Sequence, residues 1–352
     1  MKDINSGTIC TFERMTGEAE SICIVTHMKP DGDAIGSSVA MYHFLKKQGK
    51  KPRIILNDPY PSYLSFLVPE DMSDDIMTYD GKPLEACEAI KGSDLIICLD
   101  FNAFHRTDNL EVPLAEATGK KILIDHHLNP SRELFDLSFS ETEISSASEL
   151  LYQILIRTSQ TGNDACRLGM ECARALMTGM TTDTNNFANS VFPSTLHMAS
   201  DLLAAGTDRD YILNRLYNQY GENRLRLMGH MMKDLMKITP DGVAYIVLDR
   251  LTMEEYGTEE GDTEGFVNMP LSIADVRMSI LAKEDEDRVR ISIRSKRGTS
   301  ANMCARRFFN GGGHENAAGG RLHVPGDVKD MAEAGAYIER VTHIFLNDEK
   351  SC

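Results

Sequence analysis

Short apolar runs alternate with stretches of helical apolar spacing over roughly the first 200 residues of the chain. The runs with the length and composition of buried strands lie at residues 22–26, 53–57, 95–99 and 121–124. Helical spacing is found at residues 34–48, 141–160, 163–179 and 194–205. Strands that alternate with helices in this way are typical of a parallel sheet covered by helices. The pattern therefore predicts an α/β fold for this part of the chain.

The helix predicted at residues 34–48 has recognisable end signals. Asp33 stands directly before it, where a carboxylate can accept hydrogen bonds from the first backbone N–H groups. Gly49 follows it and readily adopts the left-handed conformation that ends many helices. We therefore expect Asp33 to cap this helix close to the end of the first strand.

After Gly206 the pattern becomes helical and polar, which predicts a helical linker at residues 206–240. A smaller α/β region follows, with its strands, a short helix and a closing helix predicted at residues 243–249, 277–282, 288–294, 299–309 and 327–347. The expected domains are thus a parallel-sheet domain, the linker and a substrate-binding domain, at residues 1–205, 206–240 and 241–352.

The charge of the chain is unevenly distributed. Its 352 residues carry 37 Lys and Arg against 53 Asp and Glu, a formal net charge of −16, so bulk electrostatics do not attract duplex DNA. Residues 277–321 are the exception, with ten basic residues against five acidic ones, or about +5. This segment is either ordinary strand-face charge or a patch for phosphates, and it runs into a glycine-rich stretch.

Other sequence features exclude several classes of protein. No apolar run approaches the ~18 to 20 residues of a membrane span, and the first residues lack the apolar region of a signal peptide. We therefore expect a cytoplasmic protein with no membrane partner. The eight cysteines form no C-x-x-C pair, which argues against a zinc site or a disulfide framework. The sequence leaves a homodimer open.

Acidic residues and histidines follow several of the predicted strands and one helix. The stretch 26-THMKPDGD-33 follows the first strand, and Asp100 and 125-DHH-127 follow two others. In open α/β sheets, ligands gather beyond the carboxyl ends of the strands. We therefore expect one group of side chains to converge there: His27, Asp31, Asp33, Asp100, His126 and Asp183.

A cluster of this composition points to metal ions. Carboxylates crowded together repel each other and raise one another's pKa unless cations hold them. Four carboxylates and two imidazoles without a thiolate suit Mn²⁺ or Mg²⁺. The ligands are too many for one ion, and two ions that share a carboxylate fit better. Each residue alone has a simpler explanation, because an Asp after a strand is commonly a helix cap or a turn residue.

The motifs resemble those of the DHH phosphoesterases, in which 125-DHH-127 and T-H-x-x-P-D-G-D are characteristic. The stretch 308-FFNGGGHENAAGG-320 resembles the G-G-G-H signature of the DHH-associated domain. Together they are similar to the RecJ-like branch, which includes nanoRNase/pAp phosphatases and cyclic-dinucleotide phosphodiesterases. The resemblance covers nearly the whole chain and implies a parallel-sheet DHH domain joined by a helical linker to a smaller α/β substrate-binding domain.

The resemblance implies a role for each residue of the cluster. One metal would be bound by His27, Asp31 and Asp100. The other would be bound by Asp33, Asp100, His126 and Asp183, so that Asp100 bridges two Mn²⁺ ions, with Mg²⁺ or Co²⁺ also tolerated by the ligand set. In the same pattern His127 contacts the scissile phosphate, and Asp125 orients an imidazole.

One position departs from the family pattern. The family's fourth motif usually reads D-T-G-x-F, whereas this chain has 183-DTNNF-187, with Asn185 in place of the glycine. Asn is the least costly replacement for Gly at a positive φ, so the departure does not argue against activity.

A second group of residues is predicted to bind substrate. Backbone N–H groups of three consecutive glycines can approach an oxyanion closely, and a helix N-terminus behind them would add its dipole. A flexible turn is the simpler explanation of such a run, and an exposed helix start is an equal alternative for Arg106. The predicted substrate-binding residues are Arg106, Arg294, Ser295, Gly311, Gly312, Gly313 and His314.

The function that the resemblance implies is Mn²⁺-dependent hydrolysis of short nucleotide phosphoesters. The candidate substrates are short single-stranded RNA (nanoRNA) and pAp, with cyclic di-AMP and pApA as an alternative. An alternative of another class is a catalytically inactive nucleotide-binding regulator. The complete set of predicted metal ligands argues against that alternative, since a regulator need not keep them.

Overall fold

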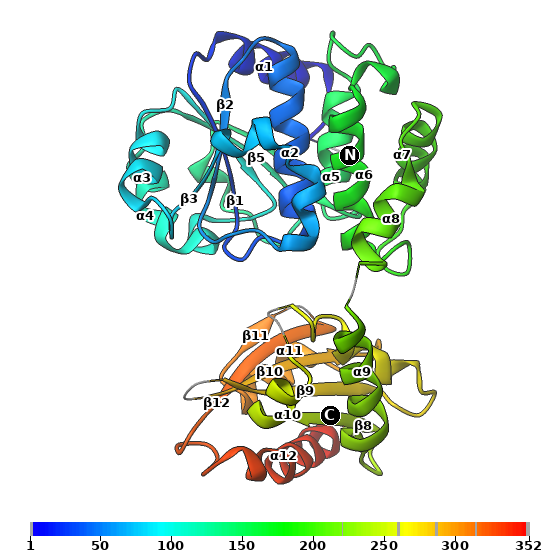
Figure 1. The fold of residues 1–352 in the computed structure, drawn as a ribbon. Coiled ribbons are helices and arrows are strands. Elements are labelled where there is room, and N and C mark those ends of the chain that lie inside the picture. Colours follow the sequence, from blue (N-terminus) through cyan, green and yellow to red (C-terminus); the bar gives the residue numbers. More distant parts are fainter. Residues whose placement is uncertain (1–2, 220, 259–260, 286–287, 314, 350–352) are drawn as a thin grey trace. The chain divides into compact units, whose positions relative to one another are not determined.

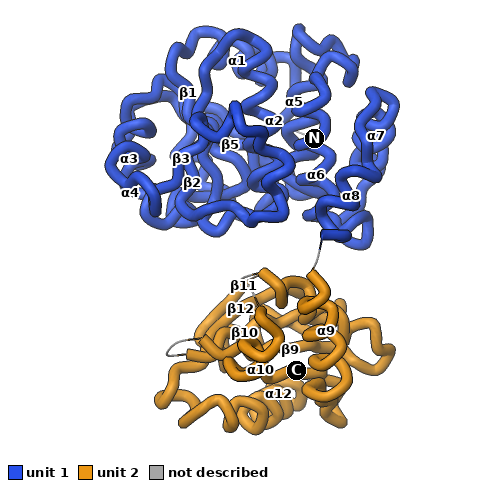
Figure 2. Tube along the Cα trace, viewed as in Figure 1, with its two compact units in different colours: residues 1–219 blue, residues 220–352 orange. Residues whose placement is uncertain are grey.

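The computed structural model describes residues 3–219, 221–258, 261–285, 288–313 and 315–349. The chain forms two compact units, residues 1–219 (unit 1) and 220–352 (unit 2), shown in Figure 2. Within the predicted linker 206–240, the helix α8 (Arg209–Tyr217) packs in unit 1, and the helix α9 (Glu222–His230) packs in unit 2. Across all described residues, no helix combines the length and apolar character of a membrane span.

Unit 1 is built on a six-stranded parallel sheet with the order β3-β2-β1-β4-β5-β6. Figure 1 shows the strands of this unit among its helices. Its strands are β1 (Ile22–Thr26), β2 (Pro52–Leu56), β3 (Ile76–Thr78), β4 (Leu95–Leu99), β5 (Lys120–Asp125) and β6 (Leu137–Ser140). The sequence predicts β1, β2, β4 and β5 to within a residue or so at each end. It misses β3 and β6, because β3 has three half-buried residues and β6 alternates apolar residues with serine.

Helices cover both faces of this sheet. Alternate residues of β1 point to opposite faces, so that Ile22 and Ile24 pack in one core and Cys23 and Val25 in another. The first core lies under α1 (Ser6–Glu18), α2 (Gly32–Lys47), α5 (Ala147–Leu155) and α6 (Met170–Asp183). The second lies under α3 (Pro83–Lys91), the 3₁₀ helix η3 (Phe104–Leu110) and α4 (Glu111–Glu116). The helix α7 (Pro193–Ala204) completes the unit.

The buried helix α2 starts at the carboxyl end of β1. Its cap is Asp31, whose Oδ1 accepts from the backbone N–H groups of Asp33 and Ala34 at 3.0 and 3.1 Å. The prediction that Asp33 caps this helix is therefore wrong, because the helix begins at Gly32 and Asp33 lies within its first turn. Farther along, a Cβ on Gly36 would lie 2.7 Å from the Ala175 carbonyl oxygen, so α2 and α6 pack backbone to backbone.

Unit 2 contains a mixed sheet with the order β11-β12-β10-β9-β8-β7, in which only β8 and β9 are parallel among the described pairs. The strands are β7 (Lys237–Ile238), β8 (Val243–Leu248), β9 (Met278–Asp285), β10 (Arg288–Ser295), β11 (Gly312–Gly313) and β12 (Ala317–His323). The helices α11 (Ala301–Phe308) and α12 (Ala334–Glu349) pack on one face. On the other face, α9, α10 (Arg250–Glu255) and the 3₁₀ helix η7 (Phe266–Ser272) pack around β8.

Candidate metal centre

Neighbouring strands of unit 1 bring the predicted ligands together. His27 follows β1, Asp100 follows β4, and His126 follows β5. Because β4 lies between β1 and β5 and all three are parallel, these residues leave the sheet at the same edge. Asp183 reaches the same place from the last residue of α6.

Asp100 lies between two imidazoles. Its Oδ2 is 3.5 Å from His27 Nε2, and its Oδ1 is 3.4 Å from His126 Nε2. The carboxylate is buried, and within the described part of the chain its Oδ1 accepts no hydrogen bond. A buried carboxylate oxygen without such a partner is costly unless a cation binds it. Asp100 therefore has the position and the free oxygen of a bridging ligand.

Three triads of potential ligand atoms share this place, and within each triad the atoms lie within 4.8 Å of one another. The first consists of His27, Asp31 and Asp100, the second of Asp33, His126 and Asp183, and the third of Asp100, His126 and His127. In the first, His27 Nε2 is 3.9 Å from Asp31 Oδ1. In the second, His126 Nε2 is 3.6 Å from Asp183 Oδ2 and 4.0 Å from Asp33 Oδ2. The third triad shares Asp100 with the first and His126 with the second, so the three groups overlap at these two residues.

The acidic cluster perturbs its own protonation. Burial, followed by the charges of Asp100 and Asp183, raises the pKa of Asp33 well above its usual range. Burial also raises the pKa of Asp183 to about 7, helped by Asp100 and against the effect of His126. These carboxylates cannot all be ionised together without positive charge between them.

The imidazoles show the complementary effect. Burial lowers the pKa of His27, but Asp100 and Asp31 outweigh it and raise that pKa to about 9. His126 behaves in the same way, and its neighbouring carboxylates raise its pKa to about 10. Burial alone would raise the pKa of Asp100, yet the two imidazoles hold it well below its usual range. In the absence of metal, protons on the imidazoles supply the positive charge that this donor set requires.

Hydrogen bonds fix the orientation of the candidate ligands. Asp33 accepts from the backbone N–H groups of Ala147 and Ser148, at 2.6 and 2.9 Å, at the start of α5. The Nδ1–H of His27 donates to the Met28 carbonyl at 2.8 Å, which leaves Nε2 to face Asp100. Such partners hold a ligand in one tautomer and one ring orientation.

His127, a member of the third triad, also forms a hydrogen-bonded pair with Asp125. His127 Nδ1 lies 2.7 Å from Asp125 Oδ1, and the His127 backbone N–H donates to Asp125 Oδ2 at 3.2 Å. Asp125 is completely buried, and both of its carboxylate oxygens contact His127. The imidazole of His127 also lies 3.7 Å from Asp100 Oδ1. The structure thus brings His127 to the edge of the candidate metal centre.

The turn after Asp183 has an unusual backbone. Asn185, Asn186 and Phe187 have φ values of 46°, 55° and 67°. Position 185 does require a positive φ, as the comparison with a family glycine suggests. Arg209 of α8 supports this turn, because its guanidinium donates to Asn186 Oδ1 and lies 5.5 Å from the centroid of the Phe187 ring. The sequence gives no signal for Arg209, which is 26 residues from Asp183 in the chain.

The predicted substrate-binding residues are divided between the units. Arg106 lies in η3 of unit 1, and its carbonyl accepts the N–H of Met28, next to His27, at 2.8 Å. In unit 2, Arg294 lies on β10, and its Nη1 donates to the Ile293 carbonyl. Ser295 is buried, and its hydroxyl donates to the Thr299 carbonyl at 2.7 Å. His314 lies outside the described residues.

The glycine run differs from its prediction. A strand, β12, follows it in place of the expected helix N-terminus, so that expectation is wrong. Gly311 N–H donates to the Ala305 carbonyl, and Gly313 N–H donates to Asn302 Oδ1 at 3.1 Å, so both groups already have partners. A Cβ on Gly311 would lie 1.9 Å from the Gly319 carbonyl oxygen. The run therefore allows a close backbone contact with β12.

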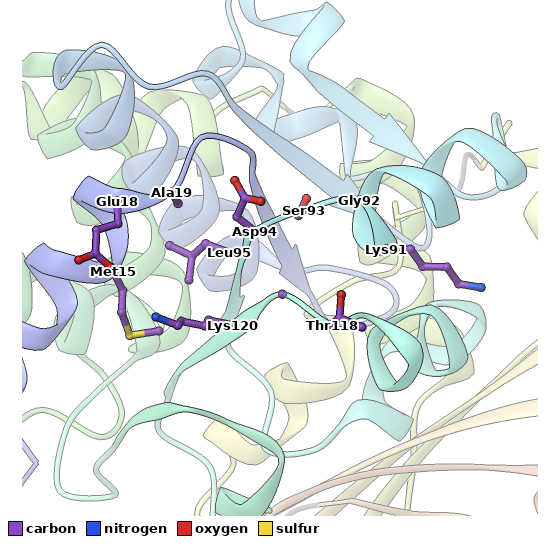
Figure 3. A pocket seen from close by; sticks show the side chains of 11 residues that line it. Met15, Glu18, Ala19, Lys91, Gly92, Ser93, Asp94, Leu95, Thr118 and Lys120 are labelled. Carbon is purple, nitrogen blue, oxygen red and sulfur yellow. The ribbon is translucent and has the colours of Figure 1, made fainter.

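A hollow of about 380 Å³ lies at the opposite end of the unit 1 strands and contains none of the predicted site residues (Figure 3). Two of its charged side chains, Asp94 and Lys91, already have partners within the protein. The Asp94 carboxylate accepts the N–H groups of Glu20 and Ser21, both at 3.0 Å, and Lys91 pairs with Glu116. The predicted site residues of unit 1 lie at the other end of these strands.

Comparison with known proteins identifies the domains. The DHH family N-terminal domain matches residues 21–180, and the DHHA1 domain matches residues 241–338. The bifunctional oligoribonuclease and PAP phosphatase NrnA of Thermus thermophilus is 30% identical over 312 residues, 86% of this chain and 84% of that protein. NrnA of Bacillus subtilis is 28% identical over 311 residues, 86% of this chain and 90% of that protein. The cyclic-di-AMP phosphodiesterase GdpP of Geobacillus thermodenitrificans is 23% identical over 344 residues, 96% of this chain but 50% of GdpP.

Solved structures agree with this assignment. An exopolyphosphatase-related protein from Bacteroides fragilis has a TM-score of 0.91 and 38% identity, with 99% of each chain covered. Exonuclease RecJ bound to manganese has a TM-score of 0.54 at 15% identity, over 96% of this chain and 93% of RecJ, which shows a common fold. With a DHH domain, a DHHA1 domain and these relatives, the chain belongs to the DHH family of phosphoesterases.

Proposed function

We propose that this protein is a metal-dependent phosphoesterase that hydrolyses short nucleotide phosphoesters, with oligoribonucleotides and pAp as its substrates. The observation that carries this proposal is the Asp100 carboxylate, buried between His27 and His126 with an oxygen that accepts no hydrogen bond from the described residues. The NrnA relatives, which are named as oligoribonucleases and PAP phosphatases, support the choice of substrates.

The donor set fits two hard or borderline divalent cations, since it contains carboxylates and imidazoles and no thiolate. We assign His27, Asp31 and Asp100 to one ion, and Asp33, Asp100, His126 and Asp183 to the other. Mn²⁺ is our first choice for both sites, with Mg²⁺ or Co²⁺ as substitutes. When bound, such a pair of ions would supply a nucleophile at neutral pH and would stabilise the negative charge of the phosphoryl oxygens.

The residues of the chain have distinct tasks in this reaction. Asp125 accepts the Nδ1–H of His127 and fixes the orientation of the ring, so that a protonated His127 Nε2 can donate to a phosphoryl oxygen of the substrate. Asp33, held by two backbone N–H groups, and His27, held by the Met28 carbonyl, need not reorient during the reaction. Preorganisation of this kind lowers the free energy needed to reach the transition state.

Substrate binding is assigned to residues of both units. Arg106, beside the loop that carries His27, would contact the phosphate nearest the metal centre. In the substrate-binding domain, residues 241–352, the proposed phosphate-binding residues are Arg294, Ser295 and the Gly311–Gly313 run with His314. The partnered N–H groups of Gly311 and Gly313 restrict the contribution of the run, and Arg294 is the main phosphate ligand of this set.

A direct test is a substrate panel with purified protein and Mn²⁺: pAp, RNA of two to five nucleotides, pApA and cyclic di-AMP. We expect turnover of pAp and short RNA, with release of nucleoside monophosphates from RNA. Turnover of cyclic di-AMP alone would assign the protein to the activity named for GdpP. If no member of the panel were turned over, the proposal that the protein is an enzyme would be wrong, and the alternative of an inactive nucleotide-binding regulator would stand.

A further inference from the structure

One face of the unit 2 sheet carries side chains that the fold does not use. Along β10, burial alternates, so that Val289, Ile291 and Ile293 pack beneath α11 and α12. Arg290 and Ser292 point to the opposite face, where they are exposed and half-buried. On that face the apolar cluster formed with α9 and η7 includes Leu281 of β9, but no residue of β10 or β12.

The strand register places three cations side by side on this face. Arg290 of β10 is directly opposite Lys283 of β9 on one side and Arg321 of β12 on the other. Directly opposed residues project from the same face, with Cβ atoms about 5 Å apart. We call Lys283, Arg290 and Arg321 the basic row. Like charges in this arrangement destabilise a sheet unless something else neutralises them.

The next set of opposed residues is neutralised within the protein. Arg288 is opposite Asp285 and His323, and its Nε lies 2.9 Å from Asp285 Oδ2. No hydrogen bond or ion pair involves the side chains of the basic row among the described residues. The chain contains 53 acidic residues, yet none of those described neutralises this row.

Protection of a sheet edge does not explain the whole row. Cations on an edge strand prevent pairing with another chain, and Arg321 fits this role, because β11 pairs only with Ala318 and Gly319 of β12. Arg290, however, lies on an interior strand between β9 and β12. No described residue of unit 2 neutralises all three charges, so the row is open to an anion from outside the unit.

We propose that the basic row binds the phosphodiester backbone of single-stranded RNA, beyond the nucleotide that Arg294 contacts. Arg290 and Arg294 project from the same strand four residues apart, which is about 13 Å. Guanidinium groups bind phosphate oxygens through two parallel hydrogen bonds. Between the two arginines the sheet carries only small residues, since Ser292 is paired with the exposed Gly319.

This inference depends on the proposed function and extends it. A nucleoside bisphosphate such as pAp that occupies Arg294 has no further phosphate for the row, whereas a five-nucleotide RNA does. The row would therefore increase the affinity for longer substrates and leave the smallest one unaffected.

The test uses the full chain with Arg290→Gln and the triple variant Lys283→Gln/Arg290→Gln/Arg321→Gln. For a five-nucleotide RNA at low salt we expect KM to rise about fivefold in the single variant and about thirtyfold or more in the triple variant, with kcat unchanged. KM for pAp should stay within about twofold of the parent value. In the triple variant, the slope of log KM for the RNA against log salt concentration should fall by about 2, since each of the three lost contacts to single-stranded nucleic acid contributes about 0.7.

Arg307→Gln is the matched control. It also removes one positive charge, but Arg307 lies on α11, beneath the other face, and pairs with Asp348 at 2.7 Å. We expect this variant to keep the parent KM for both substrates. Equal effects of Arg307→Gln and Arg290→Gln, equal effects on pAp and RNA, or no effect of the triple variant would each overturn the proposal, and the last outcome would leave the row with edge protection alone.

A binding measurement keeps this test separate from the enzymatic proposal. Fluorescence anisotropy of a labelled five-nucleotide RNA without divalent cations should show weaker binding to the triple variant than to the parent, whether or not the parent turns over any substrate. Failure of the proposed function would appear as inactive parent protein, and failure of this inference as equal affinities. Single-stranded DNA of the same sequence should bind alike, because phosphate contacts do not read the 2′-hydroxyl. If the triple variant lost binding to vesicles of phosphatidylcholine and phosphatidylserine but bound RNA as well as the parent does, the proposal would be wrong and the row would be assigned to a membrane surface.

Discussion

The two units each contain a cluster of like charge, and the clusters are built in different ways. Two of the four carboxylates of the candidate metal centre, Asp33 and Asp100, are buried, and Asp33 is held by two backbone N–H groups. The basic row in unit 2 stands on a sheet face, and Arg290 and Arg321 are exposed. Repulsion is stronger in the first cluster, because a buried site has a lower effective dielectric constant.

The difference indicates what each cluster binds. Fixed and buried ligands suit a small ion that stays in place, since little further ordering is needed when it binds. Long exposed side chains suit a partner that comes and goes, because water can solvate them when the partner is absent. We therefore expect the unit 1 cluster to affect stability and turnover, and the basic row to affect mainly the affinity for longer substrates.

Asp100→Asn should produce the largest effect. It removes the one carboxylate placed between both imidazoles, and kcat for pAp should fall by about a thousandfold or more. Mn²⁺ at about 100 times its Kd should stabilise the parent by about 2.7 kcal/mol, which is roughly 5 to 10 °C in the Tm of a unit of this size, and this shift should be lost in the variant. Asp80→Asn, at an exposed position, is the control. Retention of more than a tenth of the activity would contradict the bridging role.

Gly311→Ala and Gly312→Ala test whether the glycine run serves the fold of unit 2 or its ligand. A Cβ at position 311 would lie 1.9 Å from a backbone oxygen, whereas one at position 312 would approach only the side chains of Arg306 and Asn302, at 3.6 Å. We expect Gly311→Ala to lower the free energy of unfolding of unit 2 by about 3 kcal/mol and Gly312→Ala by less than about 1 kcal/mol. Denaturant unfolding measures both, and equal losses would contradict the packing explanation.

Asp125→Asn distinguishes the orientation of His127 from metal binding. The amide keeps the size of the side chain but can present its NH₂ group to His127 Nδ1, which favours the other tautomer. We expect kcat to fall by about 10- to 100-fold, while the stabilisation by Mn²⁺ remains. Asp136→Asn is the control, since that carboxylate accepts the Lys121 N–H at the far end of β5. If the Mn²⁺ effect vanished together with activity, Asp125 would belong to the metal centre itself.

The sequence predicts much of unit 1 because its signals are local. Continuous apolar runs identify β1, β4 and β5, and each run ends directly at an acidic or imidazole residue, so placing the strands also places the candidate ligands. Strands without such runs are missed, as β6 shows. The apolar spacing predicts Asp33 as the helix cap, whereas the structure has Asp31, because spacing cannot tell which of two aspartates two residues apart starts the helix.

Unit 2 is predicted less completely, because its important features depend on pairing between strands. The glycine run gives the same signal for a phosphate-binding loop and for a strand packed closely on its neighbour, and only the contact between Gly311 and Gly319 distinguishes them. The sequence shows the excess of basic residues at 277–321, but it does not show that Lys283 and Arg321, which are 38 residues apart, lie in one row. The register of β9, β10 and β12 brings them together.

Arg209→Gln should give the smallest effect and shows how far the metal centre depends on residues around it. The guanidinium supports the positive-φ turn that follows Asp183, through Asn186 Oδ1 and the face of the Phe187 ring. Its loss should let this turn relax and displace the Asp183 carboxylate slightly, so we expect a rise of about fivefold in the Mn²⁺ concentration that gives half-maximal activity. At saturating Mn²⁺, kcat should recover. Arg215→Gln on the same helix is the control, because Arg215 contacts the Tyr211 ring and not the turn. A lowered kcat that excess Mn²⁺ does not restore would place Arg209 in contact with substrate and would make the turn part of the binding surface.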